Sequence, residues 1–271
     1  MSVLEAIILG IVQGAAEFLP ISSSGHLVLV PWWLGWDAPP LVFDVAVHVG
    51  TTAAIIAHFW RDWLRLVGAG LNAVRKRAIT EPDARVFFFL ILGTIPAGVA
   101  GLLLDDYFET TFSEPALVAC MLFVTAGLLL YSERHTGTPH TMQEMTWRDA
   151  LFIGVAQALA IMPGISRSGS TIAAGLLRDL NRDQAARYSF LLATPIILAA
   201  GTLQAVDVVT GEASLAGGLG TAVAVGFVTS AVVGYACIAL LLRFIRQQRL
   251  TVFALYCIAF GAVSLIAALA G

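Results

Sequence analysis

The chain has 271 residues, of which 58% are hydrophobic and only 12% are charged, and its formal net charge is −3. This composition is too apolar for a soluble domain of this length and predicts a polytopic helical membrane protein. Nucleic-acid binding is disfavoured, because the basic residues are placed to orient membrane spans and lack interleaved aromatic loops.

Six stretches are long and apolar enough to cross a bilayer core of about 30 Å, which requires about 17 to 25 helical residues. In chain order they are Leu41–Trp60, Val86–Leu104, Pro115–Tyr131, Tyr188–Val206, Leu219–Leu242 and Val252–Ala270. The three cysteines, Cys120, Cys237 and Cys257, fall inside these spans and give no metal-ligand spacing and no disulfide framework. The first residues lack the basic stretch of a secretory signal.

Two segments of the chain are degenerate copies of each other. Ala6–Gly25 aligned with Ala150–Gly169 has eight identities in twenty positions, where chance would give roughly one or two. The identical pairs are Ala6/Ala150, Gly10/Gly154, Gln13/Gln157, Ala16/Ala160, Ile21/Ile165, Ser22/Ser166, Ser24/Ser168 and Gly25/Gly169. Each copy is a short apolar helix that breaks at a proline and continues into a Ser/Gly loop. Such paired, broken segments indicate the functional site of a membrane protein, and we expect two re-entrant helical hairpins.

Basic residues orient the predicted spans. The first of them form one cluster after the first span: Arg61, Arg65, Arg75, Lys76, Arg77 and Arg85. The positive-inside rule places this connection in the cytoplasm and both termini outside. The acidic residues then expected outside are Asp105, Asp106, Glu109, Asp207 and Glu212. Each copy contains three full spans, and this odd number inverts the second repeat. We therefore expect residues 1–271 to form one domain of two inverted repeats, about 1–135 and 145–271. The Ser/Gly loops of the two repeats can then meet near the midplane.

The first half-helix carries a polar pair and a stripe of small residues. Gln13 and Glu17 are four residues apart and therefore share one face of the helix. Ala6, Gly10 and Gly14 form a stripe that is suited to close helix packing. An unpaired acid in hydrocarbon is costly, so Glu17 indicates function, with a helix-end carboxylate near a loop as the plainer alternative.

His26 begins the next half-helix and follows a run of hydroxyls. The preceding residues are Ser22, Ser23, Ser24 and Gly25. A base, hydroxyl groups and the positive end of a helix come together there. A structural histidine that donates to a backbone carbonyl is the alternative for His26 alone.

The second loop supplies a cation. Arg167 lies in an apolar stretch and needs an anionic partner if it is buried, and its planar fork suits phosphate oxygens. Gly169, Ser170 and Thr171 can present backbone N–H groups at this helix N-terminus. The plainer alternatives are a salt bridge to Glu17 alone and helix capping by the serines. Asp44 and His48, four residues apart in the first span, are a weaker pair that lines the cavity or forms a structural hydrogen bond.

Both loops resemble the two signature motifs of the undecaprenyl-pyrophosphate phosphatase, or bacitracin-resistance, family. The matching stretches are Gln13–His26 and Pro163–Thr171, and the resemblance spans nearly the whole chain. It implies an enzyme of the bacterial cell membrane that hydrolyses the C55 polyprenyl diphosphate to its monophosphate, recycles the lipid carrier of peptidoglycan synthesis and confers bacitracin resistance. The family motif has Glu or Gln at the position of Gln13, so one carboxylate of a two-carboxylate metal site is absent here.

The resemblance also implies roles for individual residues. Glu17 would hold a divalent cation, Mg²⁺ or alternatively Ca²⁺, with Gln13 positioning the cation or a water. Arg167 would clamp the diphosphate, with Ser166, Ser168 and Thr171 donating hydrogen bonds to it. The nucleophile is Ser23 or His26, with the other as base or orienter, and neutral imidazole is the better nucleophile at pH 7. Positioning and charge neutralisation matter most in phosphoryl transfer.

A secondary transporter or flippase of polyprenyl phosphate is the alternative function, since it would use the same inverted repeats and helix ends. The acid and His26 beside the serines favour the enzyme, because a transporter needs no nucleophile. The expected partners are the polyprenyl diphosphate and membrane lipids, with a homodimer as the candidate assembly. Bacitracin would compete for the substrate without binding the protein. The cavity is expected to open to the extracytoplasmic side.

Overall fold

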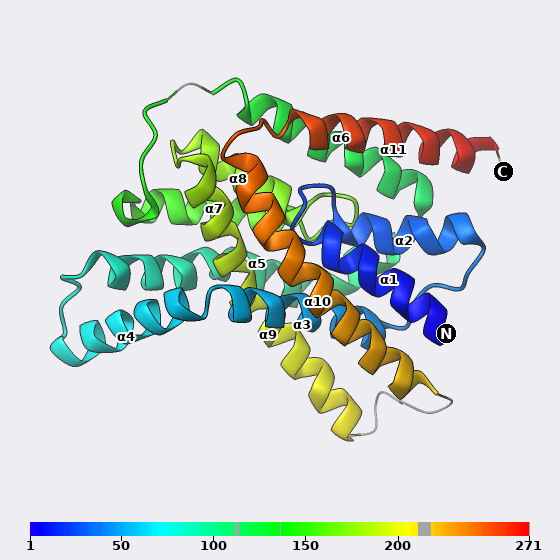
Figure 1. The fold of residues 1–271 in the computed structure, drawn as a ribbon, viewed down its shortest axis with the longest axis horizontal. Coiled ribbons are helices and arrows are strands. Elements are labelled where there is room, and N and C mark those ends of the chain that lie inside the picture. Colours follow the sequence, from blue (N-terminus) through cyan, green and yellow to red (C-terminus); the bar gives the residue numbers. More distant parts are fainter. Residues whose placement is uncertain (112–113, 136, 211–217, 271) are drawn as a thin grey trace.

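The computed structural model of this chain describes residues 1–111, 114–135, 137–210 and 218–270 and is entirely helical there, without named strands (Figure 1). The helices are α1 (Val3–Ala16), α2 (Ser23–Leu34), α3 (Leu41–His58), α4 (Trp60–Lys76), α5 (Pro82–Thr111), α6 (Pro115–Ser132), α7 (Trp147–Leu159), α8 (Arg167–Leu177), α9 (Arg182–Thr210), α10 (Leu219–Ile245) and α11 (Thr251–Ala270), with a 3-10 turn at Met142–Glu144. The predicted all-α class is confirmed.

Six helices, α3, α5, α6, α9, α10 and α11, are long and apolar enough to cross a membrane. They coincide with the six predicted spans, so the chain is a multi-pass membrane protein. Of the acidic residues predicted outside, Glu212 lies outside the described residues, as do the side chains of Asp105, Asp106, Glu109 and Asp207.

The helix boundaries differ from the predicted ones in physically simple ways. The first span ends at His58 and not at Trp60, because the backbone leaves helical geometry at Phe59, with φ −104° and ψ 23°. Helix α4 then begins, which the sequence analysis did not predict. Its buried residues are Leu66, Ala69, Gly70 and Ala73, and it packs on the start of α5 to form a hairpin at the left of Figure 1. Helices α5 and α9 extend beyond the predicted spans at both ends, since charged residues in water-facing turns do not end a helix.

Small residues bring α1 and α7 close to their neighbours. A Cβ atom on Gly14 of α1 would lie 2.8 Å from the carbonyl oxygen of Ser230 in α10. A Cβ atom on Gly154 of α7 would lie 2.5 Å from the carbonyl oxygen of Gly93 in α5. Both contacts require glycine, which confirms the predicted close packing of the first half-helix and extends it to the second copy.

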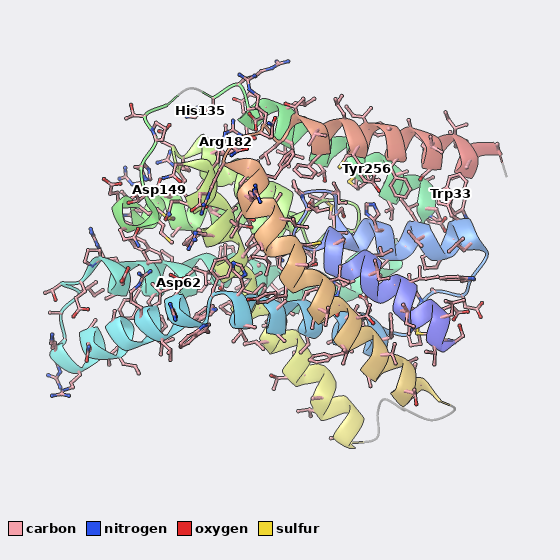
Figure 2. The ribbon with its side chains drawn as sticks, viewed as in Figure 1. Trp33, Asp62, His135, Asp149, Arg182 and Tyr256 are labelled. Carbon is pink, nitrogen blue, oxygen red and sulfur yellow. The ribbon has the colours of Figure 1, made fainter. Side chains whose placement is uncertain are left out.

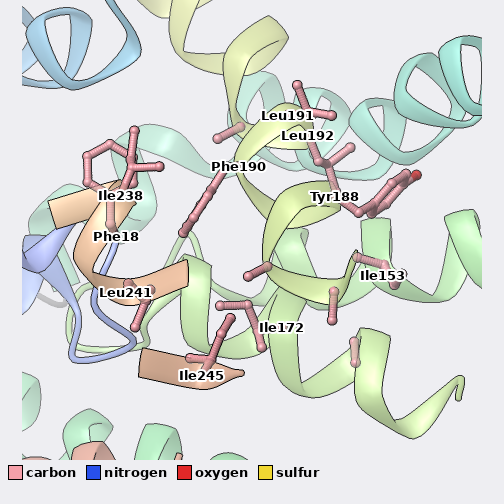
Figure 3. Close-up of a cluster of buried hydrophobic side chains, with 14 of the residues drawn as sticks. Phe18, Ile153, Ile172, Tyr188, Phe190, Leu191, Leu192, Ile238, Leu241 and Ile245 are labelled. Carbon is pink, nitrogen blue, oxygen red and sulfur yellow. The ribbon is translucent and has the colours of Figure 1, made fainter. Parts of the chain in front are cut away.

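The largest hydrophobic cluster connects the first loop to the long helices α9 and α10. The ring of Phe18 meets the ring of Phe190 edge to face, with centroids 5.3 Å apart. Tyr188, fully buried two residues before Phe190, donates a hydrogen bond of 2.8 Å to the carbonyl oxygen of Phe89 in α5. Figure 3 shows these side chains together with residues of α7, α8 and α10. The loop after α1 is therefore held by packed aromatic rings.

The two Ser/Gly loops touch each other, as the duplication predicted. A Cβ atom on Gly25 would lie 3.2 Å from the Cα atom of Gly164, and one on Gly169 would lie 3.4 Å from the Cβ atom of Pro20. Each loop thus presents a glycine to the other copy. This contact joins segments that lie about half the chain apart.

Candidate active site

Glu17 is the residue on which the site converges. It follows α1 directly and its side chain is buried, with the residue 5% exposed. One carboxylate oxygen, Oε2, accepts hydrogen bonds from Gln13 Nε2 at 2.9 Å and from Ser23 Oγ at 2.6 Å. The other, Oε1, accepts a hydrogen bond from Nη2 of Arg167. A single carboxylate therefore links the first half-helix, its own loop and the second loop.

Arg167 is the first residue of α8 and is held on two sides. Besides its contact with Glu17, its Nη1 donates to the backbone carbonyl of Ser189 in α9 at 3.2 Å. The Ser189 hydroxyl in turn lies 2.6 Å from Thr171 Oγ1. Sequence analysis did not identify Ser189, because a serine inside a long apolar span carries no signal of the loop that it faces.

Of the three serines in the first loop, Ser23 contacts Glu17, and Ser22 and Ser24 contact groups within the loop. Ser22 caps α2, with its Oγ accepting from the Gly25 N–H at 3.2 Å, and its φ of 71° is strained for a residue other than glycine. Ser24 Oγ lies 3.3 Å from Ser22 Oγ. Ser23 is thus the serine of this loop that contacts Glu17.

His26 faces away from the acid. Its Nδ1 lies 2.7 Å from the carbonyl oxygen of Ser22, and its Nε2 lies 2.7 Å from the hydroxyl of Tyr256 in α11. Its ring stacks on Phe260, with centroids 4.8 Å apart. Within the described part of the chain, no hydrogen bond joins His26 to Ser23. The contact with a backbone carbonyl is the one that the structural alternative for this histidine predicted.

The three serines of the second loop differ in their contacts. Ser166 Oγ accepts from the Gly169 N–H at 3.0 Å and so caps α8. Ser168 Oγ donates to the carbonyl oxygen of Leu19 in the first loop at 3.2 Å. The Ser170 hydroxyl is buried without a hydrogen-bond partner among the described residues.

Thr125 of α6 is a further residue that the sequence analysis missed. Its hydroxyl accepts from the Ser166 N–H at 2.9 Å and donates to the carbonyl oxygen of Gly164 at 3.1 Å. It therefore fixes the second loop on both sides of Ile165.

His48 lies beside Glu17 and contacts the backbone of Asp44, and of this pair Asp44 lines a cleft. His48 Nε2 is 3.7 Å from Glu17 Oε2, and His48 Nδ1 is 2.8 Å from the carbonyl oxygen of Asp44. A cleft of about 540 Å³ extends from Ser24 and Asp44 between α2 and α3. Its apolar walls include Leu27 and Trp32. Two polar side chains among apolar walls suit a ligand that has a polar head and a lipid tail.

The oxygens that could hold a cation come from Gln13 and Glu17. A carboxylate only accepts hydrogen bonds, so the Gln13 amide must turn Nε2 toward Glu17, and its buried Oε1 has no partner among the described residues. Among the described residues, no group of three or more His, Cys, Asp or Glu side chains is arranged to hold a metal. One carboxylate and one amide oxygen fit a cation that takes its remaining ligands from phosphates and water.

A half-buried arginine at a helix N-terminus, beside a buried carboxylate that accepts a serine hydrogen bond, gives this multi-pass membrane protein a site suited to an anionic group. The model of the family "Bacitracin resistance protein BacA" matches residues 6–263, and the chain belongs to this family. The resemblance of the two motifs is thereby confirmed.

Relatives over nearly the full length are named undecaprenyl-diphosphatase. The protein from Desulforudis audaxviator is 44% identical over 269 residues, which cover 99% of each chain. The one from Methanosphaera stadtmanae is 44% identical over 276 residues, with 98% of each chain covered. The one from Pelotomaculum thermopropionicum is 43% identical over 270 residues, which cover 100% of this chain and 98% of the relative.

Proposed function

We propose that this chain hydrolyses undecaprenyl diphosphate to undecaprenyl phosphate and inorganic phosphate, and so recycles the lipid carrier for peptidoglycan synthesis. The activity agrees with the name of the full-length relatives and with the family. The observation that carries the proposal is that Glu17 contacts both a hydroxyl, on Ser23, and a cation, Arg167. Phosphoryl transfer needs a proton acceptor, a nucleophile and a group that stabilises charge, and in this proposal Glu17, Ser23 and Arg167 supply them in that order.

In the proposed reaction, Arg167 binds the diphosphate oxygens and Glu17 takes the proton of the Ser23 hydroxyl. Ser23 Oγ attacks the terminal phosphorus, and the bond from that phosphorus to the bridging oxygen breaks, which releases undecaprenyl phosphate. Water then attacks the phosphoserine, and the bond between phosphorus and Oγ breaks. Oγ regains its proton from Glu17, and inorganic phosphate leaves with the oxygen of the water.

His26 serves in this scheme as an orienter and not as the nucleophile. Its two ring nitrogens already face Ser22 O and the Tyr256 hydroxyl, which supports this assignment. Second-loop groups, Thr171 foremost, hold Arg167 in place. Asp44 lines the cleft, and His48 lies between Asp44 and Glu17.

A divalent cation, Mg²⁺ or Ca²⁺, belongs to the proposal as a cofactor. Glu17 and the free Oε1 of Gln13 would hold it. When bound, it would neutralise charge on the phosphate oxygens.

The proposed topology has two inverted repeats, about residues 1–135 and 145–271, each beginning with a re-entrant hairpin. In support, α1 and α2, like α7 and α8, are too short to cross a membrane singly. Further support comes from an exchange of packing partners between the repeats. Helix α1 of the first repeat packs on α10 of the second, while α7 of the second repeat packs on α5 of the first. The proposed location is the bacterial cell membrane, with the cleft open to the extracytoplasmic side.

A flippase of polyprenyl phosphate is the second candidate, and the exchange of partners between repeats is the observation that favours it. The hydrogen bond from Ser23 to Glu17 favours the enzyme, because transport needs no activated hydroxyl. A homodimer, and competition of bacitracin for the lipid and not for the protein, stay predictions.

Phosphate release from C55 diphosphate by purified protein in detergent tests the proposal, since detergent removes any membrane gradient. Glu17→Ala and Arg167→Ala should each lower the rate at least about 100-fold, the usual effect of removing one charge-stabilising group. Glu81→Ala, at an exposed acid far from both loops in sequence, is the matched control. No release by the wild type would refute the phosphatase, and more than about a tenth of wild-type rate in either variant would refute that residue's role.

A further inference from the structure

Helix α11 contacts the first helix pair at several points along its length. The ring of Phe260 stacks on His26, and the Tyr256 hydroxyl lies 2.7 Å from His26 Nε2. Farther along, Trp33 Nε1 donates to Ser264 Oγ at 3.1 Å. Figure 2 shows Tyr256 on α11 near α2, with Trp33 closer to the C-terminal end of α11. The last helix of the chain therefore supports the helix that follows the Ser23 loop.

The hydrogen bonds of His26 define its tautomer. The carbonyl oxygen of Ser22 can only accept, so Nδ1 must carry a hydrogen. In the neutral ring, Nε2 is then the acceptor, and the hydroxyl of Tyr256 donates to it. Tyr256 thus favours the tautomer that donates to Ser22.

The Ser22 carbonyl belongs to the peptide bond that leads into Ser23. Ser22 has a φ of 71°, a conformation that costs free energy in any residue other than glycine and that neighbouring contacts must hold. His26 Nδ1 holds the carbonyl of this residue at 2.7 Å. The same oxygen also accepts the His26 backbone N–H at 3.2 Å, so His26 contacts the peptide that leads into Ser23 through both its ring and its backbone.

We propose that Tyr256 is a positioning residue, whose hydroxyl fixes the tautomer of His26 and thereby orients Ser23 toward Glu17. The inference rests on the proposed phosphatase function and extends it to α11. It places a residue of the second repeat behind the nucleophile of the first. Its contact with His26 makes the last helix necessary for a full reaction rate.

Tyr256→Phe removes the hydroxyl and keeps the ring. We expect kcat to fall about tenfold, the effect of one hydrogen bond, with KM unchanged within about twofold because Tyr256 does not contact the phosphates. Tyr235→Phe is the matched control. The Tyr235 ring also lies against a histidine, with its centroid 5.4 Å from that of His58, but its hydroxyl makes no hydrogen bond among the described residues. Its kcat should equal that of the wild type.

His26→Asn separates positioning from other roles. The asparagine amide can donate to Ser22 O from near the position of Nδ1, without help from Tyr256. We expect this variant to keep at least about a tenth of the wild-type kcat, and Tyr256→Phe to add no further loss in its background. His26→Ala, which lacks the donor, should be slower than His26→Asn.

The outcomes are distinguishable. A wild-type kcat in Tyr256→Phe would overturn the positioning role. So would an equal loss of kcat when Tyr256→Phe is introduced into the wild type and into His26→Asn. An inactive His26→Asn variant would place His26 in the chemistry itself and overturn it as well. Absence of phosphate release by the wild type would instead refute the proposed function.

Discussion

Glu17 and Arg167, 150 residues apart in the chain, form a hydrogen-bonded ion pair inside the protein. A buried pair of this kind adds little net stability, because desolvation of both charges offsets their attraction. In the proposed reaction, an incoming diphosphate competes with Glu17 for the Arg167 guanidinium and leaves the carboxylate to accept the Ser23 proton. The pair therefore connects substrate binding to activation of the nucleophile.

Arg167→Lys should lose at least about 100-fold in kcat/KM although it keeps the charge. The guanidinium contacts Glu17 and the Ser189 carbonyl through two different nitrogens, a geometry that one ammonium group does not reproduce. Arg178→Lys is the control, at the other end of α8, where Arg178 pairs with Asp149. A rate within about threefold of wild type in Arg167→Lys would show that charge alone suffices.

A covalent phosphoserine should accumulate at Ser23 during turnover. Phosphoserine survives acid and is lost in alkali, whereas phosphohistidine behaves in the opposite way, so quenching with labelled substrate under both conditions distinguishes Ser23 from His26. The acid-stable label should disappear in Ser23→Ala and persist in His26→Asn. An alkali-stable label would assign the nucleophile to His26, and no label under either condition would favour direct attack by water.

Gln13→Glu should make the enzyme more dependent on divalent cations. The wild-type amide donates to Glu17, while a carboxylate in its place repels Glu17 unless a cation lies between them. We expect half-maximal activity at a Mg²⁺ concentration about tenfold lower, and a larger loss on chelation with EDTA. Identical Mg²⁺ titrations for the two proteins would exclude Gln13 from the cation site. Gln143→Glu, in the turn before α7, is the control.

The Glu133 carboxylate should make thermal stability fall in acid. Burial raises the pKa of Glu133, but hydrogen bonds from Arg182, at 2.5 and 2.6 Å, and from the Leu250 N–H outweigh this effect and hold the pKa below its ordinary value. A lowered folded-state pKa gives stability that is present above the unfolded-state pKa, about 4.3, and is lost as the pH falls through the folded-state value.

Glu133→Gln should therefore have a lower Tm at pH 7 and a smaller drop in Tm between pH 5 and pH 3 than the wild type, measured in detergent. Glu81→Gln, at the exposed pair with Lys76, should behave as wild type. Parallel Tm profiles for Glu133→Gln and wild type would contradict the assignment.

Hydropathy predicted the six spans because each is a long stretch in which apolar residues far outnumber charged ones. It did not predict α4, because Arg61, Asp62 and Arg65 interrupt the apolar pattern in the first turns of that helix. Helix α4 is amphipathic, and its stability depends on packing against α5, which lies after it in the chain.

The sequence predicted the charged residues of the two loops. It did not predict the hydroxyl-bearing residues of the long helices that contact those loops. The duplication predicted that the loops of Glu17 and Arg167 meet, and the ion pair follows from two opposite charges in apolar surroundings. Thr125, Ser189 and Tyr256 lie inside long helices, where only three-dimensional packing determines the loop that each side chain faces. The direction of His26 depends on Tyr256 and could not be read from the motif for the same reason.

The direction in which the site opens can be tested with single cysteines. Ser2, before α1, and Ala78, between α4 and α5, are both exposed. The connection that contains Ala78 carries Arg75, Lys76 and Arg77, so the positive-inside rule places it in the cytoplasm and Ser2 outside.

In a variant without the three native cysteines, Ser2→Cys should react with a membrane-impermeant thiol reagent in intact cells, and Ala78→Cys should react only after the cells are opened. The cysteine-free parent is the control for background labelling. With Ser2 outside, α1 leads from the outer face to Glu17, which suits a diphosphate that is set free on the outer leaflet after glycan transfer. Reaction at Ala78 with protection at Ser2 would invert the chain and turn the cleft toward the cytoplasm, while the contacts among Glu17, Ser23 and Arg167 would still support a phosphatase.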